Sequence, residues 1–405
     1  MAATAQPQTG RQTVSPTAGP SGRLVALLAV ACGMTVANLY YAQPLLSSLS
    51  AFFGIGTAAA GALITTTQIG YVAGMLFLVP LGDRVEKRRL VVLLLSVTTL
   101  ALVVAGTAAT FPVLLAASLV AGGTSVVAQI LVPFAAGLAP DHARGRVVGR
   151  VMSGLLTGIL LSRTLSSLVS QVAGWRVVYL GSAVLMAVLA LALRSALPRH
   201  APSTNMSYAR LLRSTARLVR THPVLVRRGL YQAAMFGAFS AFWTTVSFVL
   251  TGPEFHYSGF GVGMFALVGA AGAAVAPLAG HWADHGLVRP MTAAAFAVAA
   301  LAFALAAIGR HDVILLAVAA VLIDMTVQTT LILGQHAIYR LDAGARARLN
   351  SVYIATFFAG GAFGSQAGSI AYHAYGWTGL TVLGAVLPVL ALLYWATEHR
   401  ATAAP

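Results

Sequence analysis

The stretch PLGDRVEKRR, residues 80–89, lies between two long apolar runs and returns in altered form as PLAGHWADHGLVR, residues 277–289. In each copy an aspartate, Asp83 or Asp284, follows one apolar run, and a basic residue precedes the next. A short charged turn between apolar runs of membrane length is typical of the water-exposed connection between two transmembrane helices. Because the copies stand about 200 residues apart in a chain of 405, the sequence predicts two related halves, each embedded in a membrane.

The composition also places the chain in a lipid bilayer. Apolar residues make up 58% of the sequence and charged residues 8%, which is more hydrophobic surface than the core of one soluble domain can hide. The net charge of +16 comes from arginines spread over short gaps, without a contiguous basic face, so we exclude nucleic-acid binding. The sequence has no catalytic triad, metal-ligand spacing or phosphate-binding loop, and we expect no enzymatic activity, cofactor or metal.

Twelve segments are apolar enough to cross a membrane, which takes about 20 residues at about 1.5 Å each. They are residues 24–48, 58–81, 90–109, 112–138, 147–172, 176–196, 226–250, 259–282, 290–308, 312–336, 349–372 and 377–396. Nearly all Lys and Arg residues fall in alternate gaps, as they do in the cytoplasmic loops of membrane proteins. We therefore expect an all-α, multi-pass protein of the cell inner (plasma) membrane, with both termini in the cytoplasm.

The spans divide the chain into five regions. These are a disordered cytoplasmic tail at 1–22, an N-terminal six-helix bundle at 23–196, a basic cytoplasmic linker at 197–225, a C-terminal six-helix bundle at 226–397 and a cytoplasmic tail at 398–405. In the linker, Arg210, Arg213, Arg217 and Arg220 follow one helical stripe, and leucines occupy much of the opposite face. This pattern is typical of an amphipathic helix on an anionic inner leaflet, and the alternative is a solvated charged linker.

Two six-helix halves, a basic central loop and the GDRVEKRR turn after the second span resemble the major facilitator superfamily, over residues 23 to 397. The strings NLYYAQPLL at 38–46, QIGY at 68–71 and RARLN at 346–350 are similar to a bacterial branch labelled as drug or metabolite exporters. The resemblance implies a monomeric secondary transporter that works by alternating access and exports a small amphipathic compound against proton entry. A uniporter or proton symporter for a small metabolite is the alternative, and a membrane enzyme or a transporter-like receptor is disfavoured.

Asp324 is the first candidate for a proton-coupling residue. It stands about 17 Å into an apolar span, close to the bilayer midplane. An ionised carboxylate there costs on the order of 2.5 to 3.5 kcal/mol, so it must face water, find a cation or hold a proton. Gln328 and Gln335 fall within about 40° of the same helix face, which predicts a polar stripe along this span. The alternative is a structural aspartate that bonds neighbouring helices.

Arg163 is the second charge inside a span and the second coupling candidate. Its position is slightly past the midplane, within snorkelling reach of the outer surface. It can pair with Asp324 across the two halves in one conformation, or attract an anionic substrate. The alternative is an arginine that packs inside its own half and bonds backbone carbonyls.

The other cavity candidates come from the first and fourth spans. They are Asn38, Tyr40, Tyr41 and Gln43 in the first span and Ser125 and Gln129 on one face of the fourth. Together they predict a mostly neutral, aromatic, hydrogen-bonding cavity for a modest-sized amphipathic molecule. For each of them helix packing is the alternative.

Because the charged turns resemble the family motif, we expect them to form a gate. The matching residues are Asp83, Arg84 and Arg88 in the first copy and Gly280 and Asp284 in the second. The resemblance implies that Asp83 caps and pairs at the cytoplasmic contact between the halves only when that side is closed. The alternative is a solvated turn that only fixes the topology.

The resemblance also implies that spans 2 and 11, and spans 5 and 8, meet at the interface between the halves. We expect glycines of these spans, such as Gly154 and Gly364, to allow close backbone contact there. A Trp or Leu at Gly364 is then expected to block transport while leaving expression intact.

Overall fold

The computed structural model describes residues 20–198, 206–342 and 345–400, and these residues form helices joined by turns and short connections, without strands. Within them, nine helices are long and apolar enough to cross a membrane, and one, Arg346–Ala396, covers two expected spans with a break at Gly376. Shorter apolar helices lie where spans 1 and 8 are expected. The all-α membrane fold is confirmed, whereas the count of twelve spans stays a prediction. The expected tail residues 1–19 and 401–405 and linker residues 199–205 lie outside the described residues.

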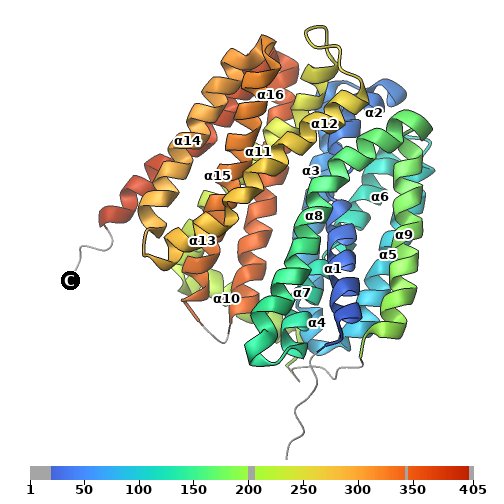
Figure 1. Ribbon diagram of the computed structural model, residues 1–405, viewed down its shortest axis with the longest axis vertical. Coiled ribbons are helices and arrows are strands. Elements are labelled where there is room, and N and C mark those ends of the chain that lie inside the picture. Colours follow the sequence, from blue (N-terminus) through green and yellow to red (C-terminus); the bar gives the residue numbers. More distant parts are fainter. Residues whose placement is uncertain (1–19, 199–205, 343–344, 401–405) are drawn as a thin grey trace, which may run out of the picture.

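The helices that precede the linker pack together on one side of the molecule (Figure 1). They are α1 (Gly22–Ala37), α2 (Leu46–Phe53), α3 (Thr57–Ala73), α4 (Leu81–Arg84), α5 (Lys87–Gly106), α6 (Phe111–Thr124), α7 (Val127–Leu138), α8 (Asp141–Ala173) and α9 (Trp175–Ala196). The expected first span is not one helix, because α1 ends at Ala37 and a 3₁₀ turn, Gln43–Leu45, precedes α2. A π-helical turn, Gly74–Leu78, joins α3 to the end of the second span.

The helices that follow the linker form the other side (Figure 1). They are α11 (Pro223–Thr251), α12 (Gly259–Ala270), α13 (Ala276–Asp284), α14 (Val288–Ile308), α15 (Val313–Tyr339) and α16 (Arg346–Ala396). A 3₁₀ turn, Ala271–Val275, separates α12 from α13, and Pro277 lies in the first turn of α13. Proline lacks the N–H that an uninterrupted helix would need here, so the eighth span is broken near its middle.

The linker contains α10 (Tyr208–Thr221), which lies at the lower end of the molecule in Figure 1. Leu211 and Leu218 are buried, whereas the four arginines predicted to form a stripe are exposed. Tyr208 donates a hydrogen bond to the Phe77 carbonyl of the N-terminal side, and Arg348 of the C-terminal side donates to Ser214. The amphipathic helix is therefore present and contacts both halves, while its contact with lipid stays a prediction.

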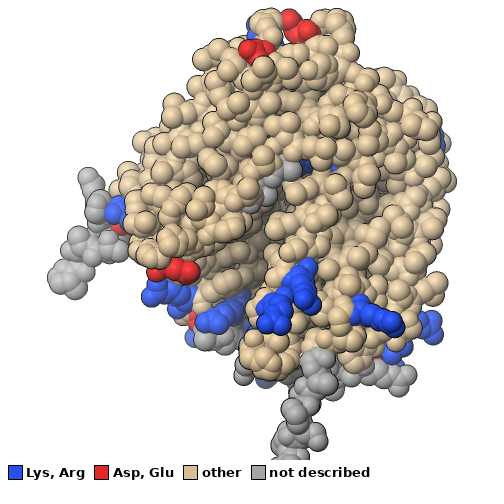
Figure 2. Space-filling model, in the orientation of Figure 1, with Lys and Arg blue, Asp and Glu red and all other residues tan. Residues whose placement is uncertain are grey.

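The two halves are joined mainly at the end that carries α2 and α12. Ser47 and Thr251 are 3.0 Å apart, and Thr164 and Ser167 of α8 donate to carbonyls of α12 at 3.0 and 2.5 Å. At the other end, Figure 2 shows a hollow between the halves with Lys and Arg side chains around its lower edge. The molecule is thus closed at one end and hollowed at the basic end.

The close glycine contacts correct the expectation from the sequence. A Cβ on Gly364 would collide with the Gly237 carbonyl of α11, and one on Gly154 would collide with the Ala29 carbonyl of α1. Both contacts lie inside one half, although α3 meets α16 and α8 meets α12 at the interface as implied. A Leu at Gly364 would therefore overpack the C-terminal half by about 1–3 kcal/mol and lower the amount of folded protein. We therefore expect lower rather than intact expression of such a variant; spacing alone does not reveal which neighbour a helix face meets.

The C-terminal end is tied to the seventh span. Glu398, in the expected cytoplasmic tail, accepts a bond from Arg228 at 3.0 Å and from the Tyr231 hydroxyl at 3.2 Å. Arg228 also donates to Thr292. This buried ion pair holds the end of α16 against α11.

Candidate functional site

The break in the first span directs its polar residues to two separate places. Asn38 caps the end of α1, and the chain then turns before Pro44 in the next 3₁₀ turn. The residue before a proline is disfavoured in the α conformation, and proline offers no N–H, so a continuous helix is unfavourable here. As a result Asn38 and Tyr41 contact α6 and α9, whereas Tyr40 and Gln43 contact α8.

One group, which we call the Asn38 cluster, consists of Asn38, Tyr41, Ser125 and Ser182, all within the N-terminal half. Ser182 donates to Asn38 Oδ1 at 2.8 Å and also lies 3.2 Å from the Tyr41 hydroxyl. The Asn38 amide nitrogen donates to Ser125 at 3.3 Å, and Ser125 donates to the Ala121 carbonyl at 2.7 Å. Every member thus has a partner, as buried polar groups usually do.

The second group surrounds Arg163 on α8. The guanidinium carbon lies 4.4 Å from the centroid of the Trp243 ring, and the rings of Tyr40 and Phe239 follow at 5.1 and 5.2 Å. Arg163 Nε donates to Gln43 Oε1 at 2.8 Å. The side chain is 5% exposed, so Arg163 points into the protein, although its position is within snorkelling reach of the outer surface. A cation stacked on aromatic faces away from water gains about 0.5–2 kcal/mol for each favourable contact.

Asp324 approaches the same place from the C-terminal half. It lies in the middle of α15 and is 9% exposed. A Cβ on Gly269 would collide with its Oδ2 and with the Trp243 ring, so the absence of a side chain on this stretch of α12 makes room for both. Asp324 and Arg163 are near enough to attract each other electrostatically. We call Gln43, Arg163, Trp243 and Asp324 the Arg163 cluster; it draws on both halves.

The Arg163 cluster differs from the Asn38 cluster in its unpaired donors. Among the described residues, Arg163 Nη2 and Gln43 Nε2 are buried without a hydrogen-bond partner, whereas the Trp243 indole interacts with the Asp324 carboxylate. Leaving one such group unpaired costs about 1–3 kcal/mol. Two unpaired N–H groups, one on Arg163 and one beside it, form a site suited to a further acceptor group from a ligand.

The remaining cavity candidates do not join this cluster. Gln129 donates to the Tyr71 hydroxyl at 3.2 Å, and Gln335 donates to Asn350 at 3.0 Å. Gln328 is half-buried on α15. The polar residues of α15 therefore do not line one common site, because Asp324 faces α11 and α12 while Gln335 contacts the start of α16.

The gate candidates lie at the ends of α4 and α13, both toward the lower part of Figure 1. Asp83 is half-buried and Arg84 exposed, and Arg88 donates to the Leu197 carbonyl of its own half at 3.5 Å. In the second copy Asp284 lies 3.9 Å from His336, also within one half. A Cβ on Gly280 would meet open space.

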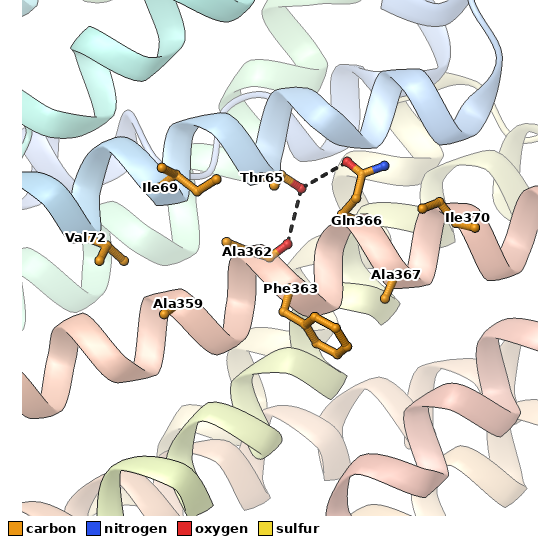
Figure 3. A pocket seen from close by; sticks show the side chains of 9 residues that line it. All are labelled: Thr65, Ile69, Val72, Ala359, Ala362, Phe363, Gln366, Ala367 and Ile370. Atoms are coloured by element: carbon orange, nitrogen blue, oxygen red, sulfur yellow. Dashed lines mark hydrogen bonds between the residues drawn. The ribbon is translucent and has the colours of Figure 1, made fainter. Parts of the chain in front are cut away.

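Two apolar grooves lie away from the polar centre. One, of about 440 Å³, lies between α3 and α16 and is lined by Ile69, Val72 and Phe363 among others (Figure 3). Among its lining residues, the Thr65 hydroxyl lies 3.3 Å from the Ala362 carbonyl and 3.4 Å from Gln366 Oε1, either of which can accept its proton. A second, of about 620 Å³, lies between α12 and α15. Because large hydrophobic side chains at their rims are exposed, we interpret both as lipid-facing surface.

The sequence analysis missed Trp243, Phe239 and Ser182. Trp243 carried a weak signal, because tryptophan in membrane helices concentrates at the two interfaces and here stands seven residues before the end of span 226–250. Phe239 precedes it by one helical turn on the same face. Ser182 carried no such signal, since a lone serine in a span is common.

A bundle of apolar helices in two halves, with polar residues gathered between them beside a hollow open at one end, is the architecture of a secondary transporter. The model of the Major Facilitator Superfamily matches residues 25–340. The chain belongs to the major facilitator superfamily.

Similar proteins agree with this assignment. The uncharacterized transporter YgaY of Escherichia coli O157:H7 is 40% identical over 385 residues, which cover 95% of this chain and 98% of the relative. The Probable transporter SCO4007 of Streptomyces coelicolor is 37% identical over 377 residues, 92% of this chain and 87% of the relative. Both names point to transport rather than to catalysis.

Solved structures support the fold. A crystal structure of a bacterial homolog to the human lysosomal transporter Spinster, in an inward-facing and occupied conformation, superimposes with a TM-score of 0.76. The alignment covers 93% of this chain and 96% of that one at 13% identity. Identity at this level shows a shared fold alone.

Proposed function

We propose that this protein is a proton-coupled transporter that carries a small amphipathic compound by alternating access, with Asp324 as the group that takes up and releases the proton. The resemblance to an exporter branch favours efflux in exchange for protons. One observation supports the coupling above all: a buried carboxyl and a buried guanidinium, Asp324 and Arg163, approach each other from different halves.

The proton would act through the attraction between these two groups. Ionised Asp324 offsets the charge of Arg163, which is costly to bury alone. Protonation removes the negative charge, so Arg163 must find another partner or reach water. Because the partners belong to different halves, the protonation state then biases how the halves pack.

The charge of the substrate decides whether substrate and proton cross the membrane in opposite directions or in the same direction. A cation binds better when Asp324 is ionised, so cation and proton exclude each other and are exchanged. An anion competes with Asp324 for Arg163 and binds better once Asp324 is protonated, so anion and proton move together. The unpaired N–H groups beside Arg163 favour the second case, which makes a proton symporter the second candidate function.

The orientation and the gate are part of the proposal. The basic end with the hollow would face the cytoplasm, with both termini on that side of the inner membrane. The five regions would then be a tail, a bundle, a linker, a bundle and a tail, as in the sequence analysis. When the hollow closes, Asp83 and Arg84 would meet the opposite half, with Gly280 and Asp284 as the weaker second copy.

The substitution Asp324→Asn tests the coupling. Purified protein is reconstituted in liposomes with the compound that most raises its melting temperature in a screen of drugs, amino acids and sugars. We expect accumulation driven by a pH gradient to fall at least about tenfold, because an amide cannot carry the proton, while exchange of labelled for unlabelled compound continues.

The matched control is Glu254→Gln, the same chemical change at an exposed residue paired with His311. It is expected to leave the driven accumulation within about twofold of the unchanged protein. If Asp324→Asn keeps the original pH dependence, Asp324 has no part in the coupling.

A further inference from the structure

We infer that the Arg163 cluster selects an organic anion, with a carboxylate bound at Arg163 and an apolar or aromatic body between the neighbouring rings. This inference rests on the second candidate of the proposed function, joint transport of an anion and a proton, and names the substrate class of the same site.

The unpaired groups of the cluster are all hydrogen-bond donors. Gln43 Oε1 already accepts from Arg163 Nε at 2.8 Å, which leaves the amide nitrogen of Gln43 free. Arg163 Nη2 is also buried and unpaired among the described side chains, and the Trp243 N–H, which interacts with Asp324, becomes available when that carboxyl is protonated. A carboxylate carries only acceptors and matches the planar geometry of a guanidinium, so it satisfies these donors better than a hydroxyl or an amine would.

The walls of the site favour an organic anion over a small inorganic one. The rings of Tyr40, Phe239 and Trp243 all lie within 5.2 Å of the guanidinium carbon. A strongly hydrated ion such as phosphate gains nothing from aromatic surface, whereas a carboxylate joined to an apolar body buries that body against it.

Two glutamines outside the Arg163 cluster each carry one unpaired acceptor. Gln68 Nε2 donates to Ser240 and Gln232 Nε2 to the Val327 carbonyl, and the amide oxygens of both glutamines are buried without a partner. They can accept a bond from a hydroxyl or amide on the body of the substrate, but they do not replace the donors that face its charge.

Asp324 makes this recognition sensitive to pH. Among the described residues, the titratable groups that act on Asp324 are Arg163 from α8 and Tyr40 from the turn after α1, while the faces of α11 and α12 present Trp243 and Gly269. Ionised Asp324 competes with the bound carboxylate for Arg163. Affinity for the anion should therefore fall as the pH rises through the titration of Asp324, and proton and anion should be transported together.

A matched set of three compounds tests the charge preference: 3-phenylpropanoate, 3-phenylpropanamide and 3-phenylpropylammonium. Binding to the purified full chain is measured by thermal shift and calorimetry at acidic and neutral pH, with phosphate as the inorganic control. We expect the carboxylate to bind at least about tenfold more tightly than the other two, and more tightly at acidic pH.

Substitutions in the cluster test which residues give the preference for a carboxylate. Arg163→Gln is expected to weaken carboxylate binding about tenfold to hundredfold, and Arg163→Lys to fall between. Asp324→Asn should bind the carboxylate at neutral pH as the unchanged protein does at acidic pH. Because Arg163 also packs among rings, Trp243→Phe serves as a milder variant that removes the indole N–H and keeps a smaller aromatic ring, with an expected loss of about threefold to tenfold.

The inference is overturned if the carboxylate does not bind, or if the ammonium compound, the amide compound or phosphate binds as tightly as the carboxylate. It is also overturned if Arg163→Gln leaves carboxylate binding unchanged. These results leave the proposed function standing as long as a pH gradient still drives transport of some compound. The proposed function fails separately, if Asp324→Asn does not alter driven transport.

Discussion

The Asn38 cluster and the Arg163 cluster are both buried groups of polar side chains, but they differ in charge and in how completely their polar groups are paired. Asn38, Tyr41, Ser125 and Ser182 bond one another or the backbone within one half. The Arg163 cluster joins two halves and keeps two donors, on Arg163 and Gln43, without a partner among the described residues. A fully paired network in one rigid body holds that body together, whereas unpaired donors between two bodies are available to a ligand.

The difference follows from what each place must do in a transporter. Residues inside a half keep the same neighbours while the halves move, so permanent bonds stabilise them at no functional cost. Residues between the halves must exchange partners in every cycle, and a permanent bond there would hold one conformation. The comparison therefore predicts that changes in the first cluster lower stability and that changes in the second alter binding.

The largest effect is expected for Gln43→Glu. A carboxylate would replace the amide oxygen that now lies 2.8 Å from Arg163 Nε. An ion pair at about 4 Å is worth on the order of 4 kcal/mol at an effective dielectric constant of about 20, so the new carboxylate should outcompete a bound one. We expect carboxylate affinity to fall at least about a hundredfold in calorimetry.

Gln129→Glu is its matched control, because Gln129 bonds Tyr71 rather than Arg163. It introduces the same charge into the same half and should change carboxylate affinity by less than about threefold. Equal losses in both variants would show that total charge, and not contact with Arg163, governs binding.

Asn38→Leu should have the second largest effect, on stability. It removes the acceptor of Ser182 and the donor to Ser125, and leaves two buried hydroxyls with fewer partners. The expected cost is about 1–3 kcal/mol, seen as a lower melting temperature in detergent. Carboxylate affinity of the protein that remains folded should stay within about twofold; a larger change would place the Asn38 cluster in the binding site.

Ser182→Ala is expected to give the smallest effect. It removes one hydroxyl that bonds Asn38 and Tyr41, at a cost of about 1 kcal/mol, or a few degrees in melting temperature. Trp243→Phe removes a polar hydrogen and part of a buried ring, so it should also lower the melting temperature, but of the two variants it alone should weaken carboxylate binding. The contrast between the two clusters collapses if both variants change binding alike.

Much of the candidate site could be predicted because a charge inside a span is visible locally. Asp324 and Arg163 were identified from their positions in apolar runs, and the structure brings them together from opposite halves. Gln43 and Tyr40 were named among many polar residues, but nothing in their spacing assigned them to Arg163. Gln328 and Gln335 were grouped with Asp324 by helical periodicity, which holds along one helix and does not say what lies opposite it.

The sequence by itself determined that the protein is a membrane bundle of two related halves, because hydropathy, charged turns and the basic gaps between spans depend only on short segments of chain. The tertiary structure alone decided which faces meet: that Gly364 packs against Gly237 inside one half, that the polar residues of the first span reach two different sets of helices, and that Trp243 lies over Arg163. Those outcomes depend on the packing of helices distant in sequence, and the energy that selects one neighbour over another is distributed over many contacts rather than encoded in any one segment.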